Sequence, residues 1–207
     1  MTVNARTITD EEFFYGHKAC PGCGGALAVR QVLRVLGPHA VAALPAGCMS
    51  ATGFNFPQLA SGNNAMITPF AATAAVLSGI EAGLRAQGAA PEDVTVVGFA
   101  GDGGTADIGL QALSGAIDRN DDVLYIYYDN EAYMNTGIQK PSSPLRLPPR
   151  PRRPERRARL FTQKKSLFDI VAAHRIPYAA TASVGYLNDS PRRWSGRAIS
   201  RAPVSST

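Results

Sequence analysis

Short apolar runs bounded by glycine, proline and polar residues occur at three places in the chain. They cover residues 40–45, 94–100 and 123–128, and the last run is rich in aromatic residues. Nearly continuous apolar strands of this length are typical of a parallel sheet that is covered on both faces. We therefore predict that these three runs are buried strands of one sheet.

Apolar residues recur at helical spacing in the segments between the strands. The pattern predicts helices over residues 26–36, 70–84 and about 107–119, and Gly37 and Pro38 stop the first of them. The last helix joins strands 94–100 and 123–128 into a βαβ unit, whose crossover is expected to be right-handed. The predicted fold class is α/β, with an open, mostly parallel sheet flanked by helices in the doubly wound manner.

The composition agrees with one folded domain outside the membrane. The chain has 207 residues, enough for one sizeable core, and 45% of them are hydrophobic. No apolar run is long enough to cross a bilayer, and the first residues lack the charged start and apolar stretch of a signal peptide. We expect a cytoplasmic protein that does not bind membranes.

The net charge of +5 belongs mostly to one segment. Residues 140–165 contain ten Lys and Arg and one acidic residue, so the rest of the chain is mildly acidic. Prolines alternate with arginines there and no hydrophobic period survives, which predicts a disordered segment over 141–160. Because no aromatic residues are interleaved for base stacking, we do not expect nucleic-acid binding.

The remaining pattern divides the chain around this basic segment. Residues 1–140 form the α/β domain, and 161–189 continue it with a helix that opens at Ser166 and a last strand over 178–182. Residues 190–207 show no regular period and are expected to form an irregular tail. We hold as a hypothesis that 141–160 and the tail are read out of frame.

The strand over residues 94–100 is followed directly by Gly101-Asp102-Gly103-Gly104. Ligands of open α/β sheets bind at the carboxyl ends of the strands, and glycines there let the backbone approach phosphate oxygens. A carboxylate among them would repel a phosphate unless a hard cation such as Mg²⁺ lay between. Asp102 therefore fits a metal ligand, with an N-capping Asp as the plainer alternative. The strand over 123–128 ends in Asp129-Asn130-Glu131, which would bring a second oxygen ligand to the same edge.

The chain has three cysteines, an odd number that argues against a disulfide framework. Cys20 and Cys23 form a Cys-x-x-Cys turn before the first predicted helix, and Cys48 follows the first predicted strand. Thiols at a helix N-terminus favour the thiolate form that metals bind. Spacing alone leaves zinc, an iron–sulfur cluster and inert thiols open.

The order of Gly-Asp-Gly, helix and a strand ending in Asn resembles the thiamine diphosphate (TPP) motif. The sequences of residues 101–109 and 128–137 are similar to those of the β subunit of pyruvate:ferredoxin oxidoreductase, a member of the 2-oxoacid:ferredoxin oxidoreductase family. The resemblance covers roughly residues 14–140 and about 161–189. In that family a loop rich in Thr and Gly lies where this chain has its Pro/Arg segment.

The resemblance implies a set of cofactor-binding residues. Asp102 and Asn130 would bind Mg²⁺ through their side chains and Ala132 through its carbonyl. The residues matched to the cofactor surroundings are Gly47, Cys48, Gly101, Gly103, Gly104 and Asn135. Asn135 and Thr136 match residues near the reacting carbon, where Asn135 is either a hydrogen-bond donor to developing charge or a plain turn asparagine.

The resemblance also implies an iron–sulfur cluster and partners. Cys20, Cys23 and Cys48 match three ligands of a [4Fe–4S] cluster, and the fourth family cysteine is absent from this sequence. The expected reaction is oxidative decarboxylation of a 2-oxoacid, pyruvate before others, with coenzyme A taking the acyl group and ferredoxin the electrons. The carboxylate that activates TPP comes from another subunit, so we expect α-, γ- and δ-type partners and no activity alone.

Two other classes of protein fit parts of the sequence. One is a TPP-dependent enzyme subunit without iron–sulfur chemistry, which predicts a colourless protein. The other is a non-enzymatic protein that binds zinc through its cysteines or acts through its basic segment, which predicts indifference to TPP. Metal content and TPP binding separate the three.

Overall fold

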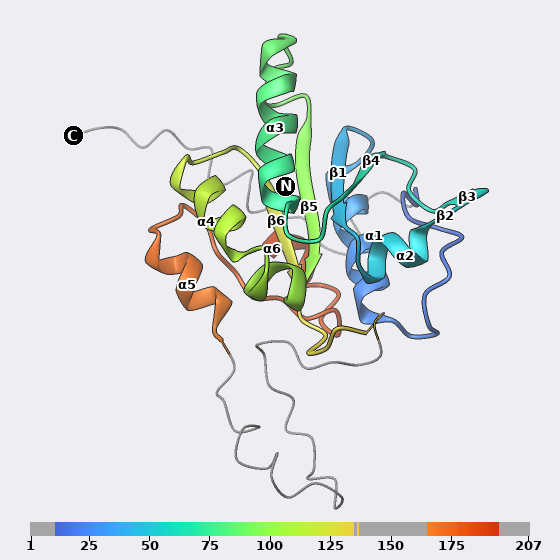
Figure 1. The fold of residues 1–207 in the computed structure, drawn as a ribbon. Coiled ribbons are helices and arrows are strands. Elements are labelled where there is room, and N and C mark those ends of the chain that lie inside the picture. Colours follow the sequence, from blue (N-terminus) through green and yellow to red (C-terminus); the bar gives the residue numbers. More distant parts are fainter. Residues whose placement is uncertain (1–10, 135, 137–164, 195–207) are drawn as a thin grey trace, which may run out of the picture.

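The computed structural model describes residues 11–134, 136 and 165–194, which are built around one parallel sheet (Figure 1). Neighbouring strands of this sheet all run in the same direction. Its strands, in spatial order, are β4 (Asn64–Thr68), β1 (Ala40–Pro45), β5 (Thr95–Gly101) and β6 (Leu124–Tyr128). The predicted α/β class with an open parallel sheet is confirmed.

Helices and one small hairpin connect and cover the strands. The helices are α1 (Gly24–Leu36), α2 (Cys48–Gly53), α3 (Thr73–Ala86), α4 (Leu110–Asp118), α5 (Leu167–Ala173) and α6 (Ser190–Trp194). A π-helical turn, η1 (Gly103–Asp107), precedes α4, and β2 (Phe54–Asn55) pairs antiparallel with β3 (Gln58–Leu59). Within the described ranges, no helix is long and apolar enough to span a bilayer.

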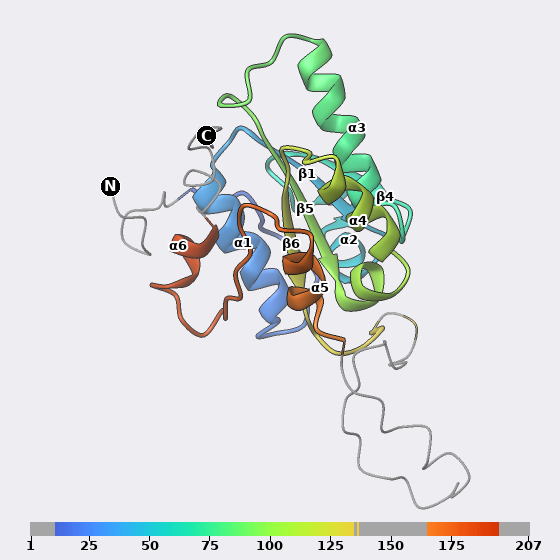
Figure 2. The ribbon, with the colours of Figure 1, turned by 90° about the vertical axis from the view of Figure 1, so that its left-hand side faces the viewer.

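The helices lie on both faces of the sheet. Figure 2 shows α1 and α6 on one side of the strands and α3 and α4 on the other. Helix α5 joins the second side, because its Leu167 packs in one apolar cluster with Leu113 and Ala116 of α4. The sheet is therefore covered by helices on both faces, as the apolar strands predict.

Alternate residues of each strand face opposite helices. In β1, Ala42 packs in the cluster around α1, whereas the neighbouring Ala43 packs against Leu77 of α3. In β6, Ile126 lies in the α1 cluster and Tyr127 in the α4 cluster. This two-residue period means that both faces of the sheet contribute to the core.

Helix α1 follows its predicted span closely. Val29, Val32 and Leu33 recur at helical spacing and are fully buried against the sheet. Gly37 ends the helix with a φ of 74°, and its N–H donates to the Leu33 carbonyl at 2.8 Å. A left-handed residue at this place favours glycine, which explains the stop signal in the sequence.

Some predicted boundaries differ from those observed. The helix expected from residue 70 begins at Thr73, and the helix expected from about 107 begins at Leu110. Residues 103–107 form a π-helical turn in which the Ile108 N–H donates to the Gly103 carbonyl at 3.2 Å. Gly109 then packs directly on the Gly104 carbonyl: a Cβ there would lie 2.0 Å from that oxygen. Only glycine allows this approach.

Two predictions for the later part of the chain are wrong. Residues 178–182 form no strand; they are mostly exposed and pair with no described strand, so burial gives this segment no reason to extend the sheet. The stretch after Asp189 is not wholly irregular, because α6 forms there and packs against α1. The predicted disordered segment 141–160 lies outside the described residues.

Candidate functional site

A pocket of about 150 Å³ lies at the carboxyl ends of β1, β5 and β6. Parallel strands bring their carboxyl ends to one edge, so segments distant in sequence meet there. Nine of its lining residues were expected from the sequence, namely Gly47, Cys48, Gly101, Asp102, Gly103, Gly104, Asn130, Ala132 and Thr136. The structure thus brings together these predicted cofactor residues; Asn135 lies outside the described residues.

Asp102 is the buried acid at the centre of this pocket. The residue is 2% exposed, and its Oδ1 accepts from the Gly103 N–H at 2.9 Å. Its Oδ2 is buried and has no hydrogen-bond partner among the described residues. Burial raises the pKa of this carboxyl above its ordinary value, opposed by the Gly103 N–H. A buried carboxylate with an unsatisfied oxygen fits a cation ligand.

The Asn130 amide faces two oxygen atoms at this place. One terminal atom of the amide lies 3.1 Å from both Asp102 Oδ1 and the Ala132 carbonyl oxygen. Both neighbours are acceptors, so this position suits either the amide nitrogen, which donates to both, or the amide oxygen together with a cation. The second arrangement gathers three oxygens from the residue after β5 and the loop after β6, a donor set that fits Mg²⁺.

The same amide also reaches Cys48. With its oxygen toward Asp102, Asn130 donates from Nδ2 to Cys48 Sγ at 3.8 Å. Cys48 is the first residue of α2, and Ser50 fixes the turn before it by accepting from the Gly47 N–H at 2.9 Å. Burial raises the pKa of the Cys48 thiol, and the Asn130 hydrogen bond opposes this. One side chain therefore joins the oxygen set to a predicted cluster ligand.

The three cysteines are free thiols in different surroundings. Cys20 is exposed, whereas Cys23, which precedes α1, and Cys48 are half-buried and pack against the same apolar cluster. The Lys18 N–H donates to the Thr52 carbonyl at 2.8 Å, which ties the loop before Cys20 to α2. In the described part of the chain, no three His, Cys, Asp or Glu residues are grouped as a metal site. The cluster assignment stays a prediction.

Aromatic residues that the sequence does not mark as cofactor ligands form part of the pocket wall. Phe70, Tyr128 and Tyr133 line the pocket together with Met134, Pro45 and Ala46. A Cβ on Gly103 would lie 2.1 Å from the Tyr133 ring, and one on Gly104 would lie 3.3 Å from Phe70. The packing of the Tyr133 ring therefore favours glycine at position 103, whereas a Cβ at position 104 would make only a tight contact with Phe70. Tyr133 lies within residues 128–137, which resemble the family sequence, whereas no pattern in the sequence predicts that Phe70 lines the pocket.

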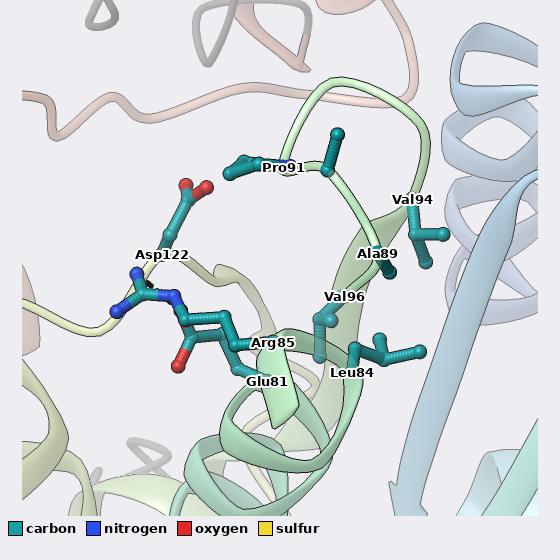
Figure 3. A pocket seen from close by; sticks show the side chains of 9 residues that line it. Glu81, Leu84, Arg85, Ala89, Pro91, Val94, Val96 and Asp122 are labelled. Carbon is teal, nitrogen blue, oxygen red and sulfur yellow. Dashed lines mark ion pairs between the residues drawn. The ribbon is translucent and has the colours of Figure 1, made fainter. Parts of the chain in front are cut away.

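A second hollow lies at the opposite end of the sheet (Figure 3). It is a small space of about 20 Å³ beside Val94 and Asp122, where β5 and β6 begin. An ion pair between Glu81 and Arg85 of α3 lies on its wall. Because strands of this sheet type bind ligands at their other ends, we assign no cofactor to this hollow.

A comparison of the chain with protein-family models supports a cofactor site at this pocket. The family model described as thiamine pyrophosphate enzyme, C-terminal TPP binding domain, matches residues 45–190. This span holds β1's end, the Gly-Asp-Gly turn and the loop after β6, which together form the pocket. The chain belongs to this family and contains its TPP-binding domain.

Similar proteins include subunits of oxidoreductases that act on 2-oxoacids. The chain is 51% identical over 189 residues to ketoisovalerate oxidoreductase subunit VorB of Pyrococcus horikoshii, covering 89% of this chain and 61% of that protein. It is 46% identical over 185 residues to pyruvate synthase subunit PorB of Methanothermobacter thermautotrophicus, covering 88% and 64%. The chain thus spans less than two thirds of the length of these curated relatives.

A solved structure shares the fold. The 2-oxoglutarate:ferredoxin oxidoreductase from Magnetococcus marinus, with 2-oxoglutarate, coenzyme A and succinyl-CoA bound, matches with a TM-score of 0.68 at 18% identity. The match covers 95% of this chain and 66% of that one. At this identity the likeness concerns the fold alone.

Proposed function

We propose that this chain is the TPP- and Mg²⁺-binding β subunit of a 2-oxoacid:ferredoxin oxidoreductase. The observation that carries the proposal is the convergence of Asp102 Oδ1, the Asn130 amide and the Ala132 carbonyl within 3.1 Å contacts at one pocket. These atoms come from two neighbouring strand ends that are far apart in the sequence. Relatives named as ketoisovalerate oxidoreductase and pyruvate synthase subunits support the same class.

The residues of the pocket divide the work of holding the cofactor. Asp102, Asn130 and Ala132 would hold the cation, and the orphaned Oδ2 of Asp102 supports this role. The turn over residues 101–104 would bring backbone N–H groups to the diphosphate. Bound TPP supplies a nucleophilic carbon for the keto group of a 2-oxoacid and stabilises the electron pair left after loss of CO₂.

Other residues would surround the reacting end of the cofactor. Thr136 lines the pocket and is proposed to lie near the reacting carbon. Asn135, which lies outside the described residues, is proposed to donate a hydrogen bond to charge that develops there. Gly47 and Cys48 close the side of the pocket formed by the end of β1.

The substrate and partners follow from the relatives and are part of the proposal. Ketoisovalerate and pyruvate share an uncharged aliphatic side chain, so we propose a 2-oxoacid of this kind, with pyruvate as the first to test. Coenzyme A would accept the acyl group and ferredoxin the electrons. The α-, γ- and δ-type subunits would complete the active site, in the cytoplasm.

For the route of the electrons, a second candidate stands beside the iron–sulfur cluster. Cys20, Cys23 and Cys48 are proposed as three ligands of a [4Fe–4S] cluster beside the cofactor. The exposure of Cys20, together with the absence of a three-residue metal group in the described ranges, favours as second candidate a TPP enzyme subunit without a cluster. Iron content separates the two.

Calorimetry of the full chain with TPP tests the cofactor site. We expect binding that needs Mg²⁺ and is lost in Asp102→Ala, because the variant removes a cation ligand and leaves the strands unchanged. Asp93→Ala is the matched control, since Asp93 is an exposed acid at the other end of the sheet, and it should bind as the unaltered chain does. Equal TPP affinity in Asp102→Ala would overturn the site assignment.

A further inference from the structure

Asp107 connects two parts of the chain that are far apart in sequence. Its Oδ2 accepts from the Tyr133 hydroxyl at 2.7 Å, and its Oδ1 accepts from Lys165 Nζ at 3.3 Å. Lys165 Nζ also donates to the Ala106 carbonyl at 2.9 Å. Asp107 is the last residue of the π-helical turn that starts at Gly103, so this network is anchored to the glycine turn of the pocket.

Tyr133 carries the network to the pocket wall. Its ring lies on Gly103 so closely that a Cβ there would be 2.1 Å from it, and its centroid is 5.9 Å from that of Phe70. The ring lines the pocket while the hydroxyl is held by Asp107. Burial and the Asp107 hydrogen bond raise the pKa of Tyr133, so its hydroxyl stays a donor at neutral pH.

The loop that Tyr133 belongs to needs support from outside. Glu131 has a φ of 59°, a left-handed conformation that is unfavourable for a residue with a side chain. Its neighbour Ala132 is 5% exposed and places its carbonyl 3.1 Å from the Asn130 amide. A contact that holds Tyr133 therefore acts one residue away from a proposed cation ligand.

The negative charge around Asp107 also favours the cationic side chain of Lys165 at this position. Burial and the charges of Asp129, Asp102 and Asp107 raise the pKa of Tyr127, and Asp107 and Asp102 also lie near Tyr133, whose pKa burial raises. Such a group of acids beside the pocket would repel an anionic diphosphate. The Lys165 side chain is 41% exposed and that of Asp107 is 17% exposed, so the pair is only partly screened by solvent.

We propose that Lys165, Asp107 and Tyr133 form a latch that positions the loop over residues 129–134 and thereby the proposed cation ligands Asn130 and Ala132. The inference rests on the proposed function, because it assigns this positioning to cofactor binding. The three are positioning residues, since they act through the loop. The latch also ties the chain after residue 164 to the pocket.

The test measures the Mg²⁺ concentration that half-saturates TPP binding to the full chain. Tyr133→Phe and Lys165→Met each remove a hydrogen bond to a carboxylate, so we expect the half-saturating concentration to rise roughly tenfold in each. Lys165→Arg keeps the positive charge and a hydrogen-bond donor, so its half-saturating Mg²⁺ concentration should stay close to that of the unaltered chain. The double variant should lose little more than either single variant, because both break the same network.

Hydrogen exchange of the backbone amides over residues 129–134 gives a second readout that needs no cofactor. Faster exchange in Tyr133→Phe and Lys165→Met, with an unchanged melting temperature, would support the latch. Unchanged exchange and unchanged Mg²⁺ dependence in both variants would overturn it. If the unaltered chain fails to bind TPP, the proposed function fails, and the exchange rates still decide whether the latch holds the loop.

Discussion

At the residue scale, the site depends on a few atoms whose surroundings leave little choice of side chain. Asp102 is buried with one oxygen lacking a partner among the described residues, and Asn130 faces two acceptors. The residue types that suit a cation could be predicted from the sequence, because carboxylate and amide oxygens stand at strand ends. Phe70 and Tyr133 could not, because only the folded backbone brings their rings onto Gly104 and Gly103.

A stability prediction at this scale concerns Gly109. In Gly109→Ala the new Cβ would lie 2.0 Å from the Gly104 carbonyl oxygen, and a backbone atom cannot move away cheaply. We expect the free energy of unfolding to fall by about 2 kcal/mol or more. Gly79→Ala is the control: Gly79 is exposed in α3 with nothing within 4 Å, so alanine should raise the stability by about 0.5 kcal/mol or more.

Urea unfolding of the two variants beside the unaltered chain gives the comparison. Equal stability of Gly109→Ala and the unaltered chain would mean that the π-helical turn over residues 103–107 can rearrange. In that case the close packing of Gly109 on the Gly104 carbonyl would not be what requires glycine at position 109.

At the scale of elements, the sequence predicts best the strands that helices cover on both faces. β1, β5 and β6 lie within one residue of their predicted bounds because their apolar runs are continuous, and α1 lies within two because its apolar residues recur at helical spacing. The edge strand β4 was not predicted, since its residues are mostly exposed and give no apolar run. The strand expected over 178–182 was wrong for the complementary reason: its small apolar residues stay exposed and pair with no described strand.

Caps were more informative than periodicity in the weaker elements. Ser166 begins α5 as predicted, with its Oγ accepting from the Asp169 N–H at 3.3 Å. The helix ends at Ala173, ahead of Pro177. Leu167 then docks α5 on α4, which connects the chain after the basic segment to the main core.

At the scale of the whole molecule, the number of cysteines limits the iron–sulfur cluster that the chain can hold. Three cysteines are present in a chain that spans less than two thirds of its curated relatives, and Cys20 is exposed. Three thiolates leave one iron corner of a cubane without a protein ligand, and that corner is open to water and oxidant.

We therefore predict that the 207-residue chain, reconstituted anaerobically, binds fewer than four irons and loses them in air. Cys48→Ala should lower the iron content further, because it removes one of the remaining thiolates. Iron and sulfide analysis with the absorbance of the cluster gives the measurement. Stable loading of four irons in air would reveal a further ligand, and one equivalent of zinc without iron would favour a structural zinc site.

Asp102, Asn130 and Ala132 are proposed to hold one divalent cation for TPP. A crystal structure of the full chain with TPP and Mn²⁺ in place of Mg²⁺ locates the cation by anomalous scattering. We predict one peak about 2.1 Å from Asp102 Oδ1, from the Asn130 amide oxygen and from the Ala132 carbonyl oxygen. A peak away from these three oxygens, or TPP bound there without any cation, would contradict the claim.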